Sequence, residues 1–243
     1  MLLRRVTKHV NDQNWLAVGL DFFVVVLGLV VGLQITNWNE DRKTAKALEA
    51  AQVRFVDESE ANLEATRVFL SNIDLALVPV RTAIGHLQAC EVDETALGDV
   101  TLAMNIIRGT QTLTLRQTAL AAITGNDDFL SRLKEQKREG LKEFQRLLTQ
   151  TQETLDWLED FPFSAHIEDH PAVQYGATFE SGLMDGDLAR QISPALPLET
   201  LCEDRDFSRR IIRWERTARF QRIRATQLVT AIEAQLALAQ GTS

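Results

Sequence analysis

Residues 15–38 read WLAVGLDFFVVVLGLVVGLQITNW, and this stretch decides the architecture of the chain. Between Trp15 and Thr36 there are 22 residues, of which 14 are Leu, Ile, Val or Phe. As a helix the stretch is about 33 Å long, enough to cross a hydrocarbon core of about 30 Å. Trp15 and Trp38 stand where interfacial aromatic anchors occur in membrane proteins. We therefore predict a transmembrane helix over residues 15–36, preceded by a short tail over residues 1–14.

Transfer energies favour a membrane span over a buried core helix or a cleaved signal peptide. The 14 large apolar side chains contribute roughly −4 to −8 kcal/mol to insertion, whereas Asp21 costs up to about 3 kcal/mol at the centre of a span. The apolar region of a signal peptide is shorter and is followed by small residues, but Gln34 and its successors offer no such cleavage site. We expect an uncleaved signal anchor.

One face of the span carries small and polar residues. Asp21, Val25, Gly28 and Gly32 are spaced four, three and four residues apart, so they share one stripe of the helix. Gly28 and Gly32 form a small-xxx-small pattern that lets two helices approach closely. We predict that this stripe pairs with a second copy or with another membrane protein. The alternative is that the glycines have no pairing role and that Asp21 reaches toward the interface.

Basic residues flank the span on both sides in equal number, and the positive-inside rule therefore gives a near tie. In the N-terminal flank the basic residues come before any acidic residue, which is typical of a signal anchor whose N-terminus stays inside. We expect a cytoplasmic N-terminus and an extracytoplasmic domain. The flanking residues are Arg4, Arg5 and Lys8 before the span and Arg42, Lys43 and Lys46 after it.

The two cysteines, Cys90 and Cys202, each follow a helical pattern. A bridge between them would close a loop of roughly 110 residues and contribute about 4–5 kcal/mol on the chain-entropy model. Such a bridge requires an oxidising compartment. The alternative is two unrelated thiols, and the sequence leaves both open. Because no CxxC pair or Cys/His cluster is present, we predict no structural zinc site.

Residues 37–243 have the composition and periodicity of a helical domain. We expect one long helix to Gln88, two short helices near residues 99–108 and 112–124, a long helix from Asp127, and a final helix over 206–239. The fold class is therefore predicted to be all-α: one N-terminal transmembrane helix followed by an antiparallel four-helix-type bundle. The apolar positions expected to face the core are Leu70, Ile73, Leu77, Val80, Ile84 and Leu87, then Leu130, Leu133, Leu141, Phe144, Leu148, Leu155 and Leu158, then Ile211, Trp214, Ala218, Ala225, Leu228 and Ile232.

Residues 161–203 hold four of the five prolines and are predicted to be an irregular connection over the bundle. Within it, His166 and His170 have the i, i+4 spacing of two metal ligands on a helix. Pro171 follows at once and no third ligand can be named, so we predict no metal site and no cofactor. The chain has no nucleophile elbow, phosphate-binding loop or HExxH motif, and we predict no catalysis.

Eight arginines and only two acids lie between Arg205 and Arg224, in a chain whose formal net charge is −8. Arg209, Arg213 and Arg216 share a helix face that would suit an anionic ligand. The alternative is a solvated face paired with acids of neighbouring helices, and the acidic remainder of the chain favours it. We predict no nucleic-acid binding, because Trp214 and Phe220 are assigned to the core.

The N-terminal segment resembles a known family. The residues that carry the resemblance are Gln13-Asn14-Trp15, Asp21 and the stretch 32–42, GLQITNWNEDR. They are similar to the N-terminal signature of an uncharacterised bacterial family, a domain of unknown function, whose members are small helical proteins with one N-terminal span. Thr118–Leu130 resembles the family's central helix–turn–helix, although Ala119 and Ala121 depart from its pattern. The resemblance implies a bacterial inner-membrane protein and implies no reaction.

These observations together predict a membrane-anchored interaction protein, an accessory or assembly subunit of a membrane complex. It would associate through its transmembrane helix as a homo-oligomer or with another membrane protein. One alternative is an extracytoplasmic sensor or ligand-binding module. A weaker alternative is a metal-dependent enzyme that uses the 161–203 connection.

Overall fold

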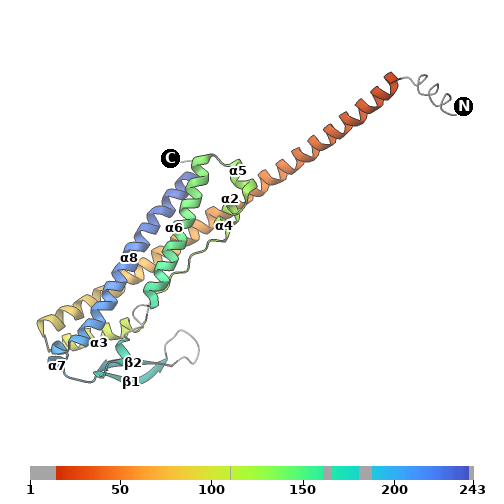
Figure 1. Cartoon of the computed structure of the whole chain (residues 1–243). Coiled ribbons are helices and arrows are strands. Elements are labelled where there is room, and N and C mark those ends of the chain that lie inside the picture. Colours follow the sequence, from red (N-terminus) through yellow and green to blue (C-terminus); the bar gives the residue numbers. More distant parts are fainter. Residues whose placement is uncertain (1–14, 110, 161–165, 181–187, 241–243) are drawn as a thin grey trace.

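The computed structural model describes residues 15–109, 111–160, 166–180 and 188–240. These residues are mostly helical, which confirms the predicted all-α class at the level of overall composition (Figure 1). In chain order the elements are α2 (Trp15–Ala89), α3 (Glu94–Ile107), α4 (Thr118–Thr124), α5 (Asp127–Arg132), α6 (Glu135–Asp160), the 3₁₀ helix η2 (Ile167–Asp169), β1 (Val173–Glu180), β2 (Leu188–Pro194), α7 (Leu198–Glu203) and α8 (Arg205–Gln240).

The predicted span and the first helix of the domain are one uninterrupted helix. Helix α2 contains 75 residues, so it is about 110 Å long. Its N-terminal part extends away from the rest of the molecule as a lone helix (Figure 1). This part is long and apolar enough to cross a membrane, and its large side chains from Phe22 to Ile35 are exposed to solvent in the structure. Helix α2 therefore joins the apolar span rigidly to the helical domain.

Helix α8 packs along α2 in the opposite direction. Three ion pairs join the two helices, and their order along α8 is the reverse of their order along α2. They are Arg67–Glu233 at 2.8 Å, Asp74–Arg222 at 2.6 Å and Arg81–Glu215 at 2.9 Å. The α2 members are seven residues apart, which is two helical turns. Helix α6 packs against α8, while α3 and α4 pack against α2. The charged ladder and the apolar seam beside it fix the antiparallel register.

The core contains most of the predicted apolar positions. Leu70, Leu133 and Ile84 are only half-buried, at the margin of the core. Along α2 the buried residues recur every three or four positions, as in coiled-coil packing. Fully or nearly fully buried side chains include Ile73, Leu77, Val80 and Leu87 of α2, Leu141, Phe144, Leu148, Leu155 and Leu158 of α6, and Ile211, Trp214, Ala218, Ala225, Leu228 and Ile232 of α8.

The helix predicted over 112–124 is shorter than expected, because residues 111–117 have no regular secondary structure and α4 begins at Thr118. Leu113 and Leu115 are buried while Thr114 between them is exposed, the two-residue period of an extended chain. Side-chain amides replace the missing helical hydrogen bonds. Asn62 of α2 bonds to both backbone groups of Arg116, and Gln152 of α6 bonds to the backbone of Leu115 and Leu113.

Two further predictions are corrected. The helix expected from Asp127 is two helices, because Leu133 adopts an extended conformation between α5 and α6. The connection at 161–203, predicted to be irregular, contains η2, an antiparallel hairpin of β1 and β2, and α7. Asn105 of α3 bonds to the backbone N–H and carbonyl of Ile192, and this contact holds the hairpin to the bundle. Residues 161–165 and 181–187 of the connection lie outside the described residues.

Candidate functional site

The glycine stripe of the span faces away from the bundle. A helix advances about 100° per residue, so the buried residues Phe55 and Ile73 lie about 180° around α2 from Gly28. A Cβ atom added to Gly28 or Gly32 would meet no atom within 4 Å. Because α2 is one helix, the face opposite the core is the same face in the span and in the domain. The stripe is therefore open to a partner helix.

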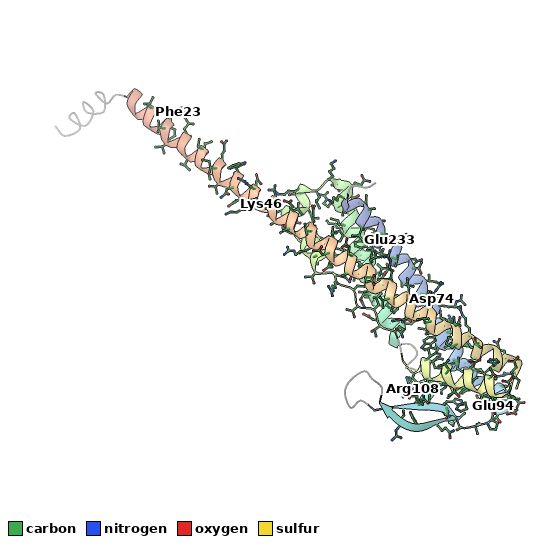
Figure 2. All side chains as sticks on the ribbon, turned by 180° about the vertical axis from the view of Figure 1, so that it is seen from behind. Phe23, Lys46, Asp74, Glu94, Arg108 and Glu233 are labelled. Carbon is green, nitrogen blue, oxygen red and sulfur yellow. The ribbon has the colours of Figure 1, made fainter. Side chains whose placement is uncertain are left out.

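Exposed apolar side chains continue this face beyond the apolar N-terminal segment of α2. Val68, Leu75 and Val78 lie within about 40° of Gly28 around the helix. They are 51%, 71% and 68% exposed. We call Val25, Gly28 and Gly32 together with Val68, Leu75 and Val78 the outward stripe. It combines a close-packing surface in the span with apolar contacts in the domain (Figure 2 shows the lone helix and the domain from behind).

Three carboxylates interrupt the outward stripe between its part in the apolar segment and its part in the domain. Asp57, Glu60 and Glu64 are exposed and lie within about 40° of Gly28 around α2. Among the described residues none of the three forms an ion pair with a cation. We call these residues the acidic band. In a parallel pair of identical α2 helices the band would face its own copy, which places like charges opposite one another.

The end of the bundle nearest the span is tied to α2. Arg132 of α5 forms an ion pair with Asp41, only five residues beyond the predicted end of the span. Arg42 lies over the ring of Trp38, 6.0 Å from its centre, and Trp38 is exposed. These contacts place the bundle next to the predicted interface. The side chains of Trp15 and Asp21, which we predicted to be an anchor and a pairing residue, lie outside the described part of the structure.

The arginines of α8 make separate contacts. Arg209 lies 4.0 Å from Asp206 of its own helix, Arg213 is half-buried, and Arg216 lies over the ring of Phe220 at 5.9 Å. Phe220 is about half exposed, so its assignment to the core is wrong. Its place in the helix, on the turn after Arg216, explains this: the guanidinium covers one face of a ring at the surface.

The predicted pairing of these arginines with acids of neighbouring helices is present in part: Asp74 of α2 pairs with Arg222, whereas Glu58 has another role. Glu58 accepts hydrogen bonds from the backbone N–H groups of Ala119 and Leu120, and so caps the start of α4. Trp214, by contrast, is buried as predicted, and its indole N–H donates to the carbonyl of Gly109.

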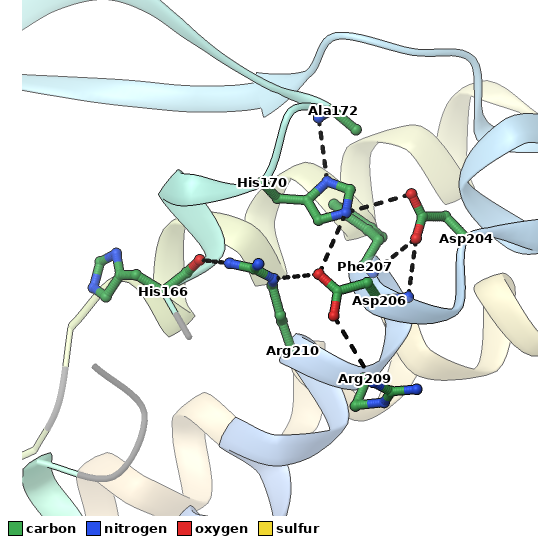
Figure 3. Close-up of polar contacts among 8 residues, drawn as sticks. All are labelled: His166, His170, Ala172, Asp204, Asp206, Phe207, Arg209 and Arg210. Carbon is green, nitrogen blue, oxygen red and sulfur yellow. Dashed lines mark hydrogen bonds and ion pairs between the residues drawn. The ribbon is translucent and has the colours of Figure 1, made fainter. Parts of the chain in front are cut away.

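His166 and His170 do not converge on one point (Figure 3). His170 is 5% exposed; its Nδ1 accepts a hydrogen bond from the N–H of Ala172, and its Nε2 lies 3.3 Å from Asp204. His166 lies 3.0 Å from Glu168 instead. Among the described residues no group of three His, Cys, Asp or Glu side chains could hold a metal ion.

The acids around His170 organise the start of α8. Asp204 accepts hydrogen bonds from the N–H groups of Asp206 and Phe207, which is the arrangement of a helix N-cap. Arg210 donates to Asp206, and its guanidinium holds the pKa of that carboxyl below its ordinary value. Arg210 also donates to the carbonyl of His166. The cluster therefore fixes η2 and the hairpin to the start of α8.

The two cysteines lie together although they are far apart in the sequence. Both are free thiols, Cys90 exposed and Cys202 half-buried on α7. The thiol of Cys202 neighbours that of Cys90, and burial, together with this neighbour, raises the pKa of Cys202 to about 11. The proximity required for the predicted bridge is thus present.

His86, one turn before the end of α2, lies between two carboxylates. Its Nδ1 contacts Glu91, and its Nε2 is 2.9 Å from Asp99 of α3. The hydrogen bond with Glu91, and then that with Asp99, raises the pKa of His86 above its ordinary value. Protonated His86 therefore joins the end of α2 to α3.

An open cavity of about 560 Å³ lies between α2, α6 and the end of α8. Its walls are mainly apolar, including Phe55 and Leu141, and its charged lining residues are Lys134, Lys137 and Glu49. Sequence reasoning did not find this cavity. Its lining residues come from several separate helices, and only the packing of those helices brings them together.

Comparison of the chain with protein-family models, with curated proteins and with solved structures finds no match. The resemblance of the N-terminal segment to an uncharacterised bacterial family stays a prediction.

Proposed function

We propose that this protein is a single-span, membrane-anchored interaction protein that pairs with another membrane protein along the outward stripe of α2. It would act as an accessory or assembly subunit of a membrane complex, with no catalysis of its own. The observation that supports the proposal most is the alignment, in one rigid helix, of Gly28 and Gly32 with exposed Leu75 and Val78. A partner helix leaving the membrane beside α2 would contact both parts at once.

We propose the topology that the sequence favours: N-terminus in the cytoplasm and bundle outside it, in a bacterial inner membrane. The domain is taken as a four-helix-type bundle. Helices α2, α6 and α8 form three of its members, and the fourth position is filled by α3, the extended residues 111–117 and α4.

Charge complementarity favours a different protein over a second copy as the partner. The acidic band would repel an identical parallel helix, since like charges facing each other destabilise a helix pair. A partner with small residues in its span and basic residues about 30–40 Å beyond the end of the span would fit Asp57, Glu60 and Glu64. The apolar contacts at Val68 and Leu75 would then lie beyond the charged region.

A photo-crosslinking amino acid at position 75 in the membrane of the source cell tests this proposal. We expect a cross-link to one protein, lost on Gly28→Leu and weakened by charge reversal at Glu64. The matched control is position 102: Leu102 of α3 is exposed to 50%, but lies off the stripe. A cross-link between two copies of this chain would identify a homo-oligomer instead. Equal cross-linking from positions 75 and 102, or none from either, would contradict a docking face on α2.

The cavity supports a second candidate function, that of a ligand-binding module. An apolar lining with Lys134 and Lys137 would suit an amphiphile with an acidic head group. Gly140 also lines the cavity, and a Cβ added there meets no atom within 4 Å. We expect the purified protein to bind a fluorescent long-chain fatty acid, and Gly140→Leu to weaken binding at least tenfold by filling the space. Unchanged binding in Gly140→Leu would remove the cavity as the site.

A further inference from the structure

Cys90 occupies an unusual backbone position at the end of α2. Its φ angle is 52°, the left-handed region in which non-glycine residues are uncommon. The N–H of Glu91 donates to the carbonyl of His86 at 3.0 Å, closing the helix end in a pattern whose left-handed residue is usually glycine. A residue with a side chain is therefore held where glycine would cost less. Backbone strain of this kind, where the surrounding structure maintains it, points to a role for the side chain.

The second thiol is presented to Cys90 by a well-packed element. Cys202 lies on α7, which packs against α2, and the neighbouring side chains Leu198 and Leu201 of α7 are buried. In Figure 1 α7 lies next to the far end of α2, where Cys90 follows the helix. The start of α8 is fixed beside it, because Asp204 caps that helix. Two elements more than a hundred residues apart thus hold their thiols next to each other.

We propose that Cys90 and Cys202 form a disulfide that fastens α7 and the start of α8 to the end of α2. The oxidant is a second disulfide, either of a small thiol compound or of a thiol-oxidising protein. This inference does not depend on the partner proposed for the outward stripe, since the pair lies at the other end of α2, far from the membrane span.

The two sulfurs would react in a defined order. Cys90 is the exposed thiol; its thiolate attacks the oxidant RSSR, forms Cys90–S–S–R and releases RS⁻. Cys202 then loses its proton, and its sulfur attacks the Cys90 sulfur and expels the second RS⁻. The sum converts two thiols and RSSR into one internal disulfide and two RSH. Because burial raises the pKa of the Cys202 thiol, only a small fraction of it is ionised. Cys202 therefore suits the second step, which is intramolecular, so that its high local concentration near Cys90 compensates for the low ionised fraction.

The experiment uses the full-length protein in detergent micelles, incubated with glutathione disulfide. We expect both cysteines to become unreactive to maleimide without added mass from glutathione, and a Cys90–Cys202 linked peptide to appear after proteolysis. Because the bridge closes a loop of more than a hundred residues, Tm should rise by about 10 °C and fall back with reductant.

Two variants keep the test decisive. Cys90→Gly retains the left-handed position without strain, and Cys202→Ala removes the half-buried thiol; both should fold and show no Tm rise with the oxidant. Retention of both reactive thiols, a stable glutathione adduct on Cys90, or a disulfide between two chains would overturn the proposal. A Tm rise in Cys90→Gly equal to that of the unaltered protein would do the same.

Discussion

Asn62 is the residue whose replacement tests the folding argument most directly. It is 3% exposed; its Nδ2 donates to the carbonyl of Arg116 at 2.8 Å, and its Oδ1 accepts from the N–H of Arg116 at 2.9 Å. Two hydrogen bonds at about 1 kcal/mol each, plus the cost of backbone groups left without partners, give about 2–4 kcal/mol for Asn62→Ala. For a domain of this size that lowers Tm by about 5–15 °C.

Thermal unfolding followed by circular dichroism in micelles measures the loss. Asn72→Ala is the matched control: the same change in the same helix at an exposed position, expected to shift stability by less than about 0.5 kcal/mol. Asn62→Asp keeps the acceptor but puts a carboxylate against a carbonyl. It should be the least stable variant at neutral pH and recover on acidification, once a protonated carboxyl can donate. Equal losses in Asn62→Ala and Asn72→Ala would refute the inferred role of the amide.

For three further substitutions, the local geometry predicts whether the free energy of unfolding rises or falls. In His86→Gln the protein should lose stability relative to the unaltered chain at low pH but not at high pH. The reason is that Glu91 and Asp99 raise the pKa of His86 in the folded protein. The stability that His86 contributes is therefore complete below its unfolded pKa of about 6.5 and disappears as pH rises through its folded pKa. Denaturant titrations between pH 5 and 9 measure this, and a stability difference between the two proteins that does not change with pH would contradict it. Gly125→Ala should destabilise by about 1–3 kcal/mol, since the new Cβ would lie 2.9 Å from a backbone carbonyl oxygen of α4. Gly140→Ala should instead stabilise by about 0.5–1 kcal/mol, since it removes a glycine from the interior of α6 without any close contact; a loss of stability there would show that the open space is needed.

Several parts of the molecule are determined by local sequence. The apolar run from Trp15 to Thr36 needs no tertiary partner to be recognised, because each side chain contributes its own transfer free energy. The buried stripes of α6 and α8 were predicted almost residue by residue, since helix periodicity alone places them on one face. The alternating Leu113 and Leu115 held a signal for an extended segment that the helix prediction overlooked.

Tertiary structure decided what depends on contacts between distant segments. The hairpin of β1 and β2 forms because each strand supplies hydrogen-bond partners to the backbone groups of the other. The short apolar runs in the sequence do not predict this pairing. The contact of Cys202 with Cys90 and the closure of the cavity require helices packed in one particular register. The apolar N-terminal helix and the helical periods are local properties, and the residues alone were therefore enough to predict them. The face of α2 that stays outward depends on which faces α8, α3 and α4 bury, and this is known only once those helices pack on α2.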